Sequence, residues 1–232
     1  MLKSLPKSEQ RVFFMTEELI FSKYRAGGAK IIPDGALSQK SYESARLKVL
    51  VVLKEPNDKN GEWCDEGGDI RRHGWEGGRE KTWPNLARWA YLFENPGATY
   101  SEADSAVADL EKRKANLRRL VVMNLKKEPG SHSAHLPTIE QYAFKYEDLL
   151  RKQFSIYKPA LTIAGGTHPI LVKLMNKKNA LRTSPEFFSY FLDENLGIVM
   201  DFYHPQPRGK PATINEELFS LLARDLKHHR LA

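Results

Sequence analysis

The chain has 232 residues with a formal net charge of +7, and 41% of them are hydrophobic. That length fits one domain, and that apolar share excludes a chain that stays disordered throughout. Its single cysteine, Cys64, excludes an internal disulfide and a zinc or iron–sulfur site built from cysteines.

The sequence has no apolar run near the ~18–20 residues that cross a bilayer, and its first residues lack the pattern of a secretory signal. We therefore expect a cytoplasmic protein without membrane contacts. The positive charge favours a polyanionic partner, because Lys and Arg contact phosphates and release counterions. Charge alone does not decide the matter, since many basic proteins bind no nucleic acid.

The hydrophobic pattern alternates between helical spacing and short continuous runs. Apolar residues that recur every three or four positions predict amphipathic helices, and short runs rich in Val, Ile and Leu are typical of strands buried in a parallel sheet. In chain order, the pattern predicts a helix over 8–25, a strand over 47–53, a helix over 83–94, a less regular helix over 102–117, a strand over 120–125, a helix from 138 onward, a strand over 160–164, a short helix after 166, a strand over 197–203 and a helix from 213 onward.

Two of these helices are predicted to start with a capping box, in which a Thr and the Glu or Gln three residues later cap each other's backbone amides. The boxes are Thr138-Ile139-Glu140-Gln141 and Thr213-Ile214-Asn215-Glu216. Strands that alternate with helices imply an α/β domain with helices on both faces of its sheet. We predict a three-layer α/β/α sandwich with a central four-stranded, mainly parallel sheet. Residues 1–232 would form this single domain, with a Gly- and Trp-rich insertion at 58–82.

Polar residues follow each predicted strand. In sheets of this kind, ligands bind beyond the carboxyl ends of the strands, so these residues are candidates for a site. Each also has an ordinary structural interpretation: Glu55 could be a solvated charge or a partner for a nearby Lys, and Asn124 could be a turn residue. The segments are Lys54-Glu55-Pro56-Asn57, Asn124, Gly165-Gly166-Thr167-His168 and His204-Pro205-Gln206-Pro207-Arg208-Gly209-Lys210.

The order of these motifs resembles the uracil-DNA glycosylase-like superfamily over roughly residues 47–226. The resemblance implies a parallel four-stranded sheet between helices. It also implies that Glu55 and Pro56 stand for the motif that ends the first strand, where an acidic or amide residue lies beside Pro. Asn124 would be the Asn that reads the base, and the loop at His204 and Pro205 would enter the duplex.

The chemistry of such an enzyme explains these residue types. Hydrolysis of an N-glycosidic bond builds positive charge on the sugar and negative charge on the departing base. Glu55 is a predicted catalytic residue, because a carboxylate below the sugar can stabilise the cation and deprotonate water. His204 is the second predicted catalytic residue, because it can stabilise the anion of the base. The carboxamide of Asn124 matches the edge of a pyrimidine.

Further residues are assigned to substrate and DNA binding. Superfamily members place a base-stacking aromatic in the part of the chain that holds the insertion, where Trp63, Trp75 and Trp83 are candidates. Prolines would stiffen the loop at His204, and its polar side chains could fill the gap left by a flipped base. The predicted substrate-binding residues are Lys54, Pro56, Asn57, Trp63, Trp75 and Asn124, and the predicted DNA-binding residues are Gly165, Gly166, His168, Pro205, Gln206, Pro207, Arg208 and Lys210.

The segment after the first strand departs from the uracil-specific pattern. Lys54-Glu55-Pro56-Asn57 replaces Asp-Pro-Tyr-His or Asn-Pro-Gly, and no tyrosine follows Pro56 to crowd out a 5-substituent. This favours a bulky modified cytosine, such as glucosylated hydroxymethylcytosine in phage DNA, which some similar glycosylases excise as an anti-phage defence. A repair glycosylase for uracil or deaminated bases and a catalytically silent DNA-binding module remain alternatives. We expect double-stranded DNA as the partner, a monomer, and no cofactor or metal.

Overall fold

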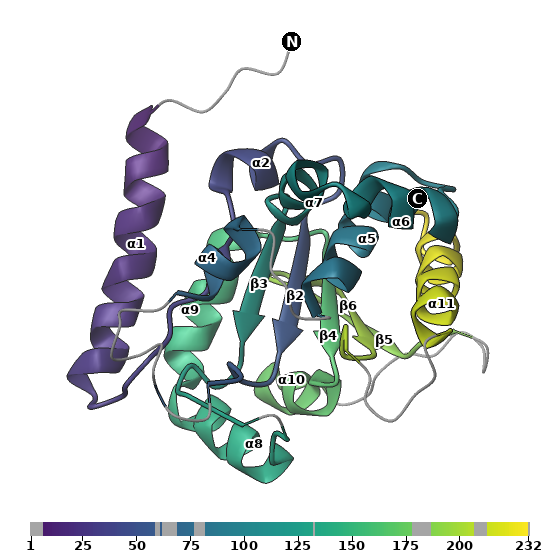
Figure 1. The fold of residues 1–232 in the computed structure, drawn as a ribbon. Helices are drawn as coiled ribbons and strands as arrows, with labels where there is room; N and C mark the ends of the chain where they lie inside the picture. The colour runs from purple at the N-terminus through teal and green to yellow at the C-terminus, as the bar shows by residue number, and fades with distance from the viewer. Residues whose placement is uncertain are drawn as a thin grey trace.

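A six-stranded mixed sheet forms the centre of the computed structural model, which describes residues 7–58, 61, 69–76, 82–131, 133–177, 187–206 and 213–231 (Figure 1). The strands are β1 (Gly35–Ala36), β2 (Val49–Leu53), β3 (Leu120–Asn124), β4 (Leu161–Gly165), β5 (Tyr190–Asp193) and β6 (Gly197–Phe202). They lie in the order β1-β3-β2-β4-β6-β5. The four inner strands are parallel to one another, and β1 and β5 pair antiparallel with them at the two edges.

The four predicted strands are the four inner strands, so the expected four-stranded sheet is wrong in its strand number. The two edge strands were missed for different reasons. β1 has only two residues, Gly35 and Ala36, which is too short for any hydrophobic pattern. β5 has four residues, of which only Phe191 is buried, and it lacks the Val and Ile residues that are typical of a strand buried in a parallel sheet.

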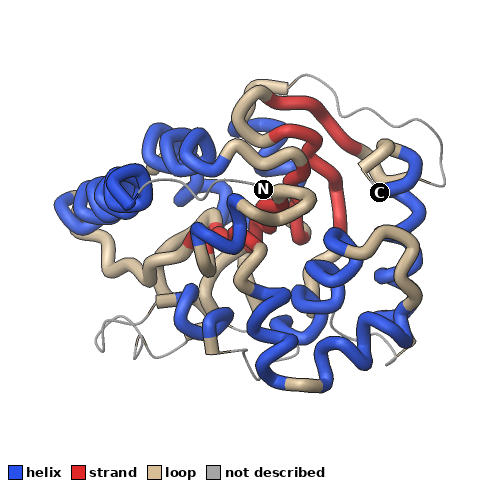
Figure 2. The backbone as a smooth tube through the Cα atoms, turned by 90° about the horizontal axis from the view of Figure 1, so that it is seen from above, coloured by secondary structure: helices blue, strands red, loops and turns tan. Residues whose placement is uncertain are grey.

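Helices cover both faces of the sheet (Figures 1 and 2). Alternate residues of β2 explain why, since Val49, Val51 and Leu53 belong to one buried core and Leu50 and Val52 to the other. The first core is closed by α5 (Thr82–Glu94), α6 (Tyr100–Ala108), α7 (Leu110–Leu117) and α11 (Ile214–His228), and the second by α8 (Leu136–Lys145), α9 (Glu147–Tyr157) and α10 (His168–Leu174).

The remaining helices lie outside these two layers or in connections. The predicted N-terminal helix is α1 (Lys7–Ala26), which packs against α9. Two short helices were not predicted: α2 (Gln39–Glu43), between β1 and β2, and α4 (Ile70–Trp75), within the insertion. Within the described ranges, no helix is long and apolar enough to cross a membrane.

The two predicted capping boxes are wrong. Helix α8 begins before Thr138, with His135 as its N-cap, because Pro137 is well suited to a first helical turn. Thr213 does precede α11, but its backbone is already helical (φ −62°, ψ −18°) and its side chain makes no capping hydrogen bond. A capping side chain needs an extended N-cap residue to reach back to the free amides.

The less regular helix predicted over 102–117 is two helices, α6 and α7. Asp109 separates them, because its backbone is extended (φ −73°, ψ 129°) and its side chain accepts a hydrogen bond from the Lys112 amide at 2.8 Å. The real capping box lies at the start of α6, between Thr99 and Glu102. The helix predicted from 138 is likewise broken, at Tyr146, into α8 and α9.

The strand order determines where a ligand could bind. From β2 the chain crosses to β3 on one side of it, and later returns to β4 on the other side. Two connections that leave in opposite directions leave a crevice beyond the carboxyl ends of the strands. Residues that follow β2, β3, β4 and β6 all meet at this edge.

Candidate functional site

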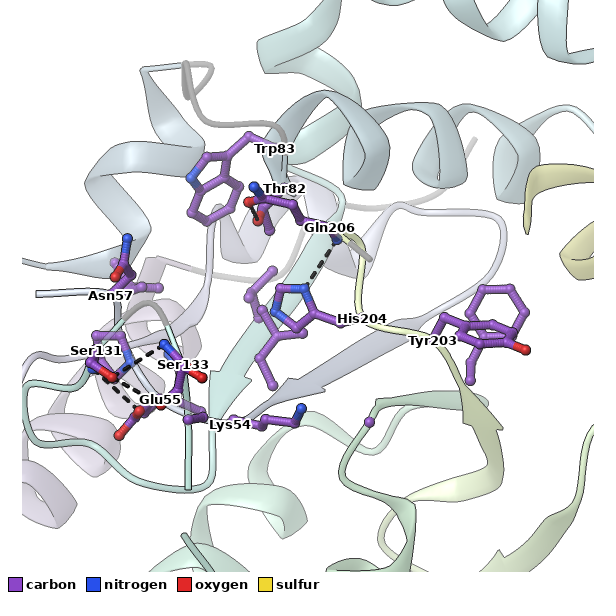
Figure 3. Close-up of a pocket in the computed structure, with 18 of the residues that line it drawn as sticks. Lys54, Glu55, Asn57, Thr82, Trp83, Ser131, Ser133, Tyr203, His204 and Gln206 are labelled. Atoms are coloured by element: carbon purple, nitrogen blue, oxygen red, sulfur yellow. Dashed lines mark hydrogen bonds between the residues drawn. The ribbon is translucent and has the colours of Figure 1, made fainter. Parts of the chain in front are cut away.

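A cavity of about 710 Å³ lies at this edge of the sheet (Figure 3). Its size falls within the ~300–1,000 Å³ range of small-molecule sites. Its walls come from the ends of β2, β3 and β6, from the start of α5 and from the loop before α8. The lining residues are Leu53, Lys54, Glu55, Pro56, Asn57, Ile70, Thr82, Trp83, Val122, Asn124, Ser131, Ser133, Ala134, Gly166, Phe188, Asp201, Phe202, Tyr203, His204 and Gln206.

The three residues at the centre of the functional prediction, Glu55, Asn124 and His204, all line this cavity. Lys54, Pro56, Asn57, Gly166 and Gln206 from the predicted site also line it. Residues 47–53 and 197–203 are more than a hundred positions apart, yet parallel pairing with β4 brings their ends together. The carboxyl ends of these parallel strands therefore bring the side chains that follow them to one edge of the sheet.

Other predicted site residues do not reach the cavity or cannot be placed. His168 is buried, 4% exposed, and does not line the cavity, and Gly165 and Pro205 are also absent from the cavity wall. Trp75 ends α4, but its side chain lies outside the described part. Trp63, Pro207, Arg208 and Lys210 also lie outside the described residues.

Asn124 is the last residue of β3 and is only 1% exposed. Its backbone amide donates to Oδ2 of Asp34 at 2.7 Å. Its side-chain Nδ2 has no hydrogen-bond partner within the described part of the chain. An unpaired buried donor costs about 1–3 kcal/mol, so a cavity that contains one is suited to a ligand with an acceptor at that point.

Glu55 follows β2, and its side chain is 7% exposed. Lys126 Nζ donates to Oε2 at 2.7 Å, and the Ser131 amide donates to Oε1 at 3.3 Å. Figure 3 shows the side chain extending toward Ser131, with His204 across the cavity. Glu55 is therefore a carboxylate held against one wall, and its oxygens are engaged by the loop that follows β3.

His204 lies in the loop after β6, and Nδ1 of its ring accepts a hydrogen bond from the Gln206 amide at 3.0 Å (Figure 3). A backbone amide can only donate, so Nδ1 carries no proton and the neutral ring carries its proton on Nε2. The loop is tied to α5, because Asn85 Nδ2 donates to the Pro205 carbonyl at 2.6 Å. Thr82 Oγ1 also donates to Gln206 Oε1 at 3.3 Å. The imidazole thus lies on a braced loop, with its proton on Nε2.

Lys54 supplies a positive charge on another wall. The structure gives its ammonium no hydrogen bond or ion pair with any described residue, and Figure 3 shows the side chain extending away from Glu55. It passes over Gly166, where a Cβ would lie 3.3 Å from Nζ. Gly166 also has a left-handed backbone (φ +72°), so a side chain there would be strained as well as crowded.

Sequence reasoning missed Asp201, a cavity residue on β6 whose side chain is 45% exposed. Its Oδ2 lies 3.9 Å from Nδ1 of His168. Burial raises the pKa of Asp201, against the lowering effect of His168. Burial likewise lowers the pKa of His168, although the charge of Asp201 opposes that shift. A signal was present, since Asp201 is the only charged residue in the run 197–203.

Aromatic side chains form much of the remaining wall. Trp83, at the start of α5, is 6% exposed and faces the cavity, so it is the tryptophan of the three candidates that the structure places there. Tyr203 is 46% exposed at the rim and packs edge-on against Phe188. These rings offer apolar faces against which a planar ligand could stack.

No group of three or more His, Cys, Asp or Glu side chains suited to a metal ion is found among the described residues. The groups that line the cavity are a paired carboxylate, an amide whose Nδ2 has no partner among the described residues, an imidazole and an ammonium. Comparisons with known proteins add nothing to this inventory. No protein-family model matches the chain, and no curated protein matches its sequence.

Proposed function

We propose that this protein is a DNA glycosylase, which flips a modified base out of DNA and hydrolyses its N-glycosidic bond to leave an abasic site. The observation that carries the proposal is the buried Asn124 amide, unpaired within the described chain, in the wall of a cavity that Glu55 and His204 also line. A base provides what this amide lacks, because the edge of a pyrimidine presents carbonyl and ring-nitrogen acceptors. A planar base also fits beside Trp83.

The polar groups match the charges that the reaction creates. As the bond between C1′ of the sugar and the base nitrogen breaks, its electron pair leaves with the base, and Nε2–H of His204 donates to the resulting anion. Positive charge develops on the sugar, where the carboxylate of Glu55 stabilises it and receives a proton from the attacking water. The oxygen of that water forms the new bond to C1′. Glu55 then releases this proton, and the base anion takes up a proton from solvent, so that the products are a neutral free base and an abasic site.

The preferred substrate in this proposal is a bulky modified cytosine such as glucosylated hydroxymethylcytosine in phage DNA. The cavity of about 710 Å³ supports this choice, as does Asn57 in place of a tyrosine that would exclude a 5-substituent. The ammonium of Lys54 and the carboxylate of Asp201 provide polar partners for hydroxyl groups. Such an enzyme would act as a monomer in the cytoplasm, on double-stranded DNA, as an anti-phage defence.

One observation favours an alternative, a catalytically silent DNA-binding module of the same three-layer α/β/α fold. The oxygens of Glu55 accept hydrogen bonds from Lys126 and the Ser131 amide, so a water molecule has to compete with these donors for the carboxylate. A silent module would bind DNA and release no base. A repair glycosylase for uracil or deaminated bases would use the same cavity and differs only in the base released.

An incision assay separates these three possibilities. Single-lesion duplexes that contain uracil or a deaminated purine, unmodified DNA and glucosylated phage DNA are incubated with the protein and then heated in alkali, which breaks the strand at each abasic site. We expect breaks in the glucosylated DNA. Breaks only at uracil or the deaminated purine would contradict the bulky-base substrate. DNA that is bound but intact in every case would contradict the proposed enzyme.

A further inference from the structure

A buried polar cluster lies behind the cavity wall at the end of β3. It consists of Asp34, Lys127 and Gln153, all 0% exposed, which come from the segment before β1, the turn after β3, and α9. None of the three lines the cavity. The cluster nevertheless contacts Asn124, which is part of the cavity wall.

The carboxylate of Asp34 is the centre of this cluster. Lys127 Nζ donates to its Oδ1 at 2.7 Å and to its Oδ2 at 2.8 Å, and Gln153 Nε2 donates to Oδ1 at 3.1 Å. The third donor is the backbone amide of Asn124, which lies 2.7 Å from Oδ2. The end of β3 is therefore held by a charged group that lies 90 positions earlier in the sequence.

Stability does not explain this arrangement. Removing two charges from water is costly, and buried ion pairs are often no more stable than apolar side chains of similar size. Burial lowers the pKa of Lys127, which reflects that penalty, while Asp34 opposes the shift. What the pair does provide is a fixed direction for the backbone that carries Asn124, because a short charge-assisted hydrogen bond restricts both distance and angle.

We propose that Asp34 is a positioning residue, which accepts from the Asn124 backbone amide and so holds Asn124 where its side-chain amide reads the base, while Lys127 compensates the buried charge of Asp34. The inference rests on the proposed function, since it concerns recognition in the same cavity. Recognition groups must be held to within about 0.5 Å of their productive geometry to discriminate between ligands. Loosening Asn124 should therefore reduce discrimination between bases more than it reduces stability.

Two double variants test this role. Asp34→Asn with Lys127→Met removes both charges but keeps a carbonyl oxygen that accepts from the Asn124 amide. Asp34→Leu with Lys127→Met removes both charges and the acceptor, while the volume stays similar. We expect the first variant to keep the wild-type ratio of kcat/KM between the preferred base and a competing pyrimidine within about threefold. The second should lower that ratio at least about tenfold, a size typical of losing one positioned contact.

Amide hydrogen exchange measured by NMR provides a readout that does not require activity. The Asn124 amide should exchange at least about 100-fold faster in Asp34→Leu/Lys127→Met than in Asp34→Asn/Lys127→Met, while core strand amides exchange alike in both. If the leucine variant does not fold, Asp34→Ser with Lys127→Met replaces it, because the shorter hydroxyl does not reach the Asn124 amide.

The outcomes separate the two proposals. A wild-type protein that releases no base from any DNA overturns the proposed function, and the exchange measurement still decides whether Asp34 positions Asn124. Unchanged exchange of the Asn124 amide in the leucine variant overturns the positioning role, whatever the activity. An active wild type, combined with an unchanged base preference in the leucine variant, overturns it as well.

Discussion

Glu55 owes its position to the backbone that passes beside it. A Cβ at Gly130 would overlap the carboxyl carbon of Glu55 and one of its oxygens, so only glycine lets the loop after β3 lie this close. The same loop provides the Ser131 amide and the Pro129 carbonyl, which accepts from Lys126 at 2.7 Å. Gly130, the Ser131 amide and Lys126 together hold the carboxylate of Glu55 in place.

Gly130→Ala should therefore displace Glu55 from Lys126. A misplacement of about 1 Å in a catalytic group can cost about 100-fold in rate, so we expect kcat to fall by roughly that factor. Single-turnover kinetics of base release would measure the loss. Gly27→Ala is the matched control, since Gly27 lies after α1 and a Cβ there has no contact shorter than 3.3 Å. A folded Gly130→Ala protein with wild-type kcat would contradict this account of Glu55.

The role of His204 depends on which ring nitrogen donates. Asn at this position keeps an acceptor near the place of Nδ1, for the Gln206 amide, but lacks the donor at Nε2. Gln at this position can place an amide donor where Nε2 lies, but it offers no acceptor to the Gln206 amide. We expect His204→Asn to lower kcat by about 10²–10³-fold with KM little changed, because a donor to the departing anion acts mainly in the transition state.

His204→Gln should keep more activity than His204→Asn, although its loop loses the hydrogen bond to Gln206. Steady-state kinetics of both variants on one substrate would show the order. The reverse order, or full activity in His204→Asn, would mean that the ring supports the loop and does not stabilise the base.

The sequence predicted those site residues that follow parallel strands, because the carboxyl ends of such strands meet at one edge whatever the loops do. It could not predict Asp34, since its contact with Asn124 depends on how a segment before β1 packs behind β3. Asp201 was missed for another reason: it lies within a strand, and only the alternation of side chains along β6 turns it toward the cavity.

At the scale of elements, the long helices and the inner strands follow from hydrophobic periodicity, while their ends do not. Thr138 and Thr213 are poor guides to helix starts because capping depends on the local backbone, which Pro137 shifts in one case.

Helix α1 is attached to α9 and α4 through the buried carboxyl group of Glu17. Glu17 is 1% exposed, accepts from Tyr157 and pairs with Arg71 at 3.4 Å.

This attachment should make stability depend on pH. Burial raises the pKa of Glu17 from 4.5 to about 7, against the lowering effects of Tyr157 and Arg71, while Asp34 and Asp69 raise it further. The folded protein thus binds this proton more tightly than the unfolded chain does. The contribution to stability is complete below about pH 4.5 and is lost as the pH rises through about 7.

Glu17→Gln keeps an acceptor for Tyr157 and removes the titration. Relative to wild type, its free energy of unfolding should rise between pH 5 and pH 8, by up to the order of 3 kcal/mol. Urea denaturation at both pH values would measure the difference. Glu18→Gln, at an exposed neighbouring position on α1, should show no such trend. A constant difference between Glu17→Gln and wild type would refute the buried-acid explanation.

At the scale of the molecule, the fold determines which lysines are engaged in ion pairs within the protein. Lys127 is buried in an ion pair and Lys126 is bound to Glu55, whereas the structure gives Lys54 no such partner among the described residues. The net charge of +7 suits a polyanion, but composition cannot show which cations are available. Only the folded arrangement distinguishes them.

Lys54→Met should therefore weaken DNA binding in a salt-dependent way. Each phosphate contact contributes about −0.9 to the slope of log K against log salt concentration, so this slope should shrink by about 1. The titration uses the Glu55→Gln background, in which DNA stays intact. Lys114→Met is the control, because Lys114 pairs with Glu111 on α7, near the opposite edge of the sheet. An unchanged slope for Lys54→Met would remove Lys54 from the DNA contacts.

Mass spectrometry of the free bases released from DNA tests the central claim most directly. The protein, Glu55→Gln and Asp201→Asn are each incubated with unmodified DNA, uracil-containing DNA and glucosylated phage DNA. The account predicts that the wild type and Asp201→Asn release glucosylated hydroxymethylcytosine and that Glu55→Gln releases none. Undiminished release by Glu55→Gln, or no free base from any of the three DNAs with the wild type, would contradict it.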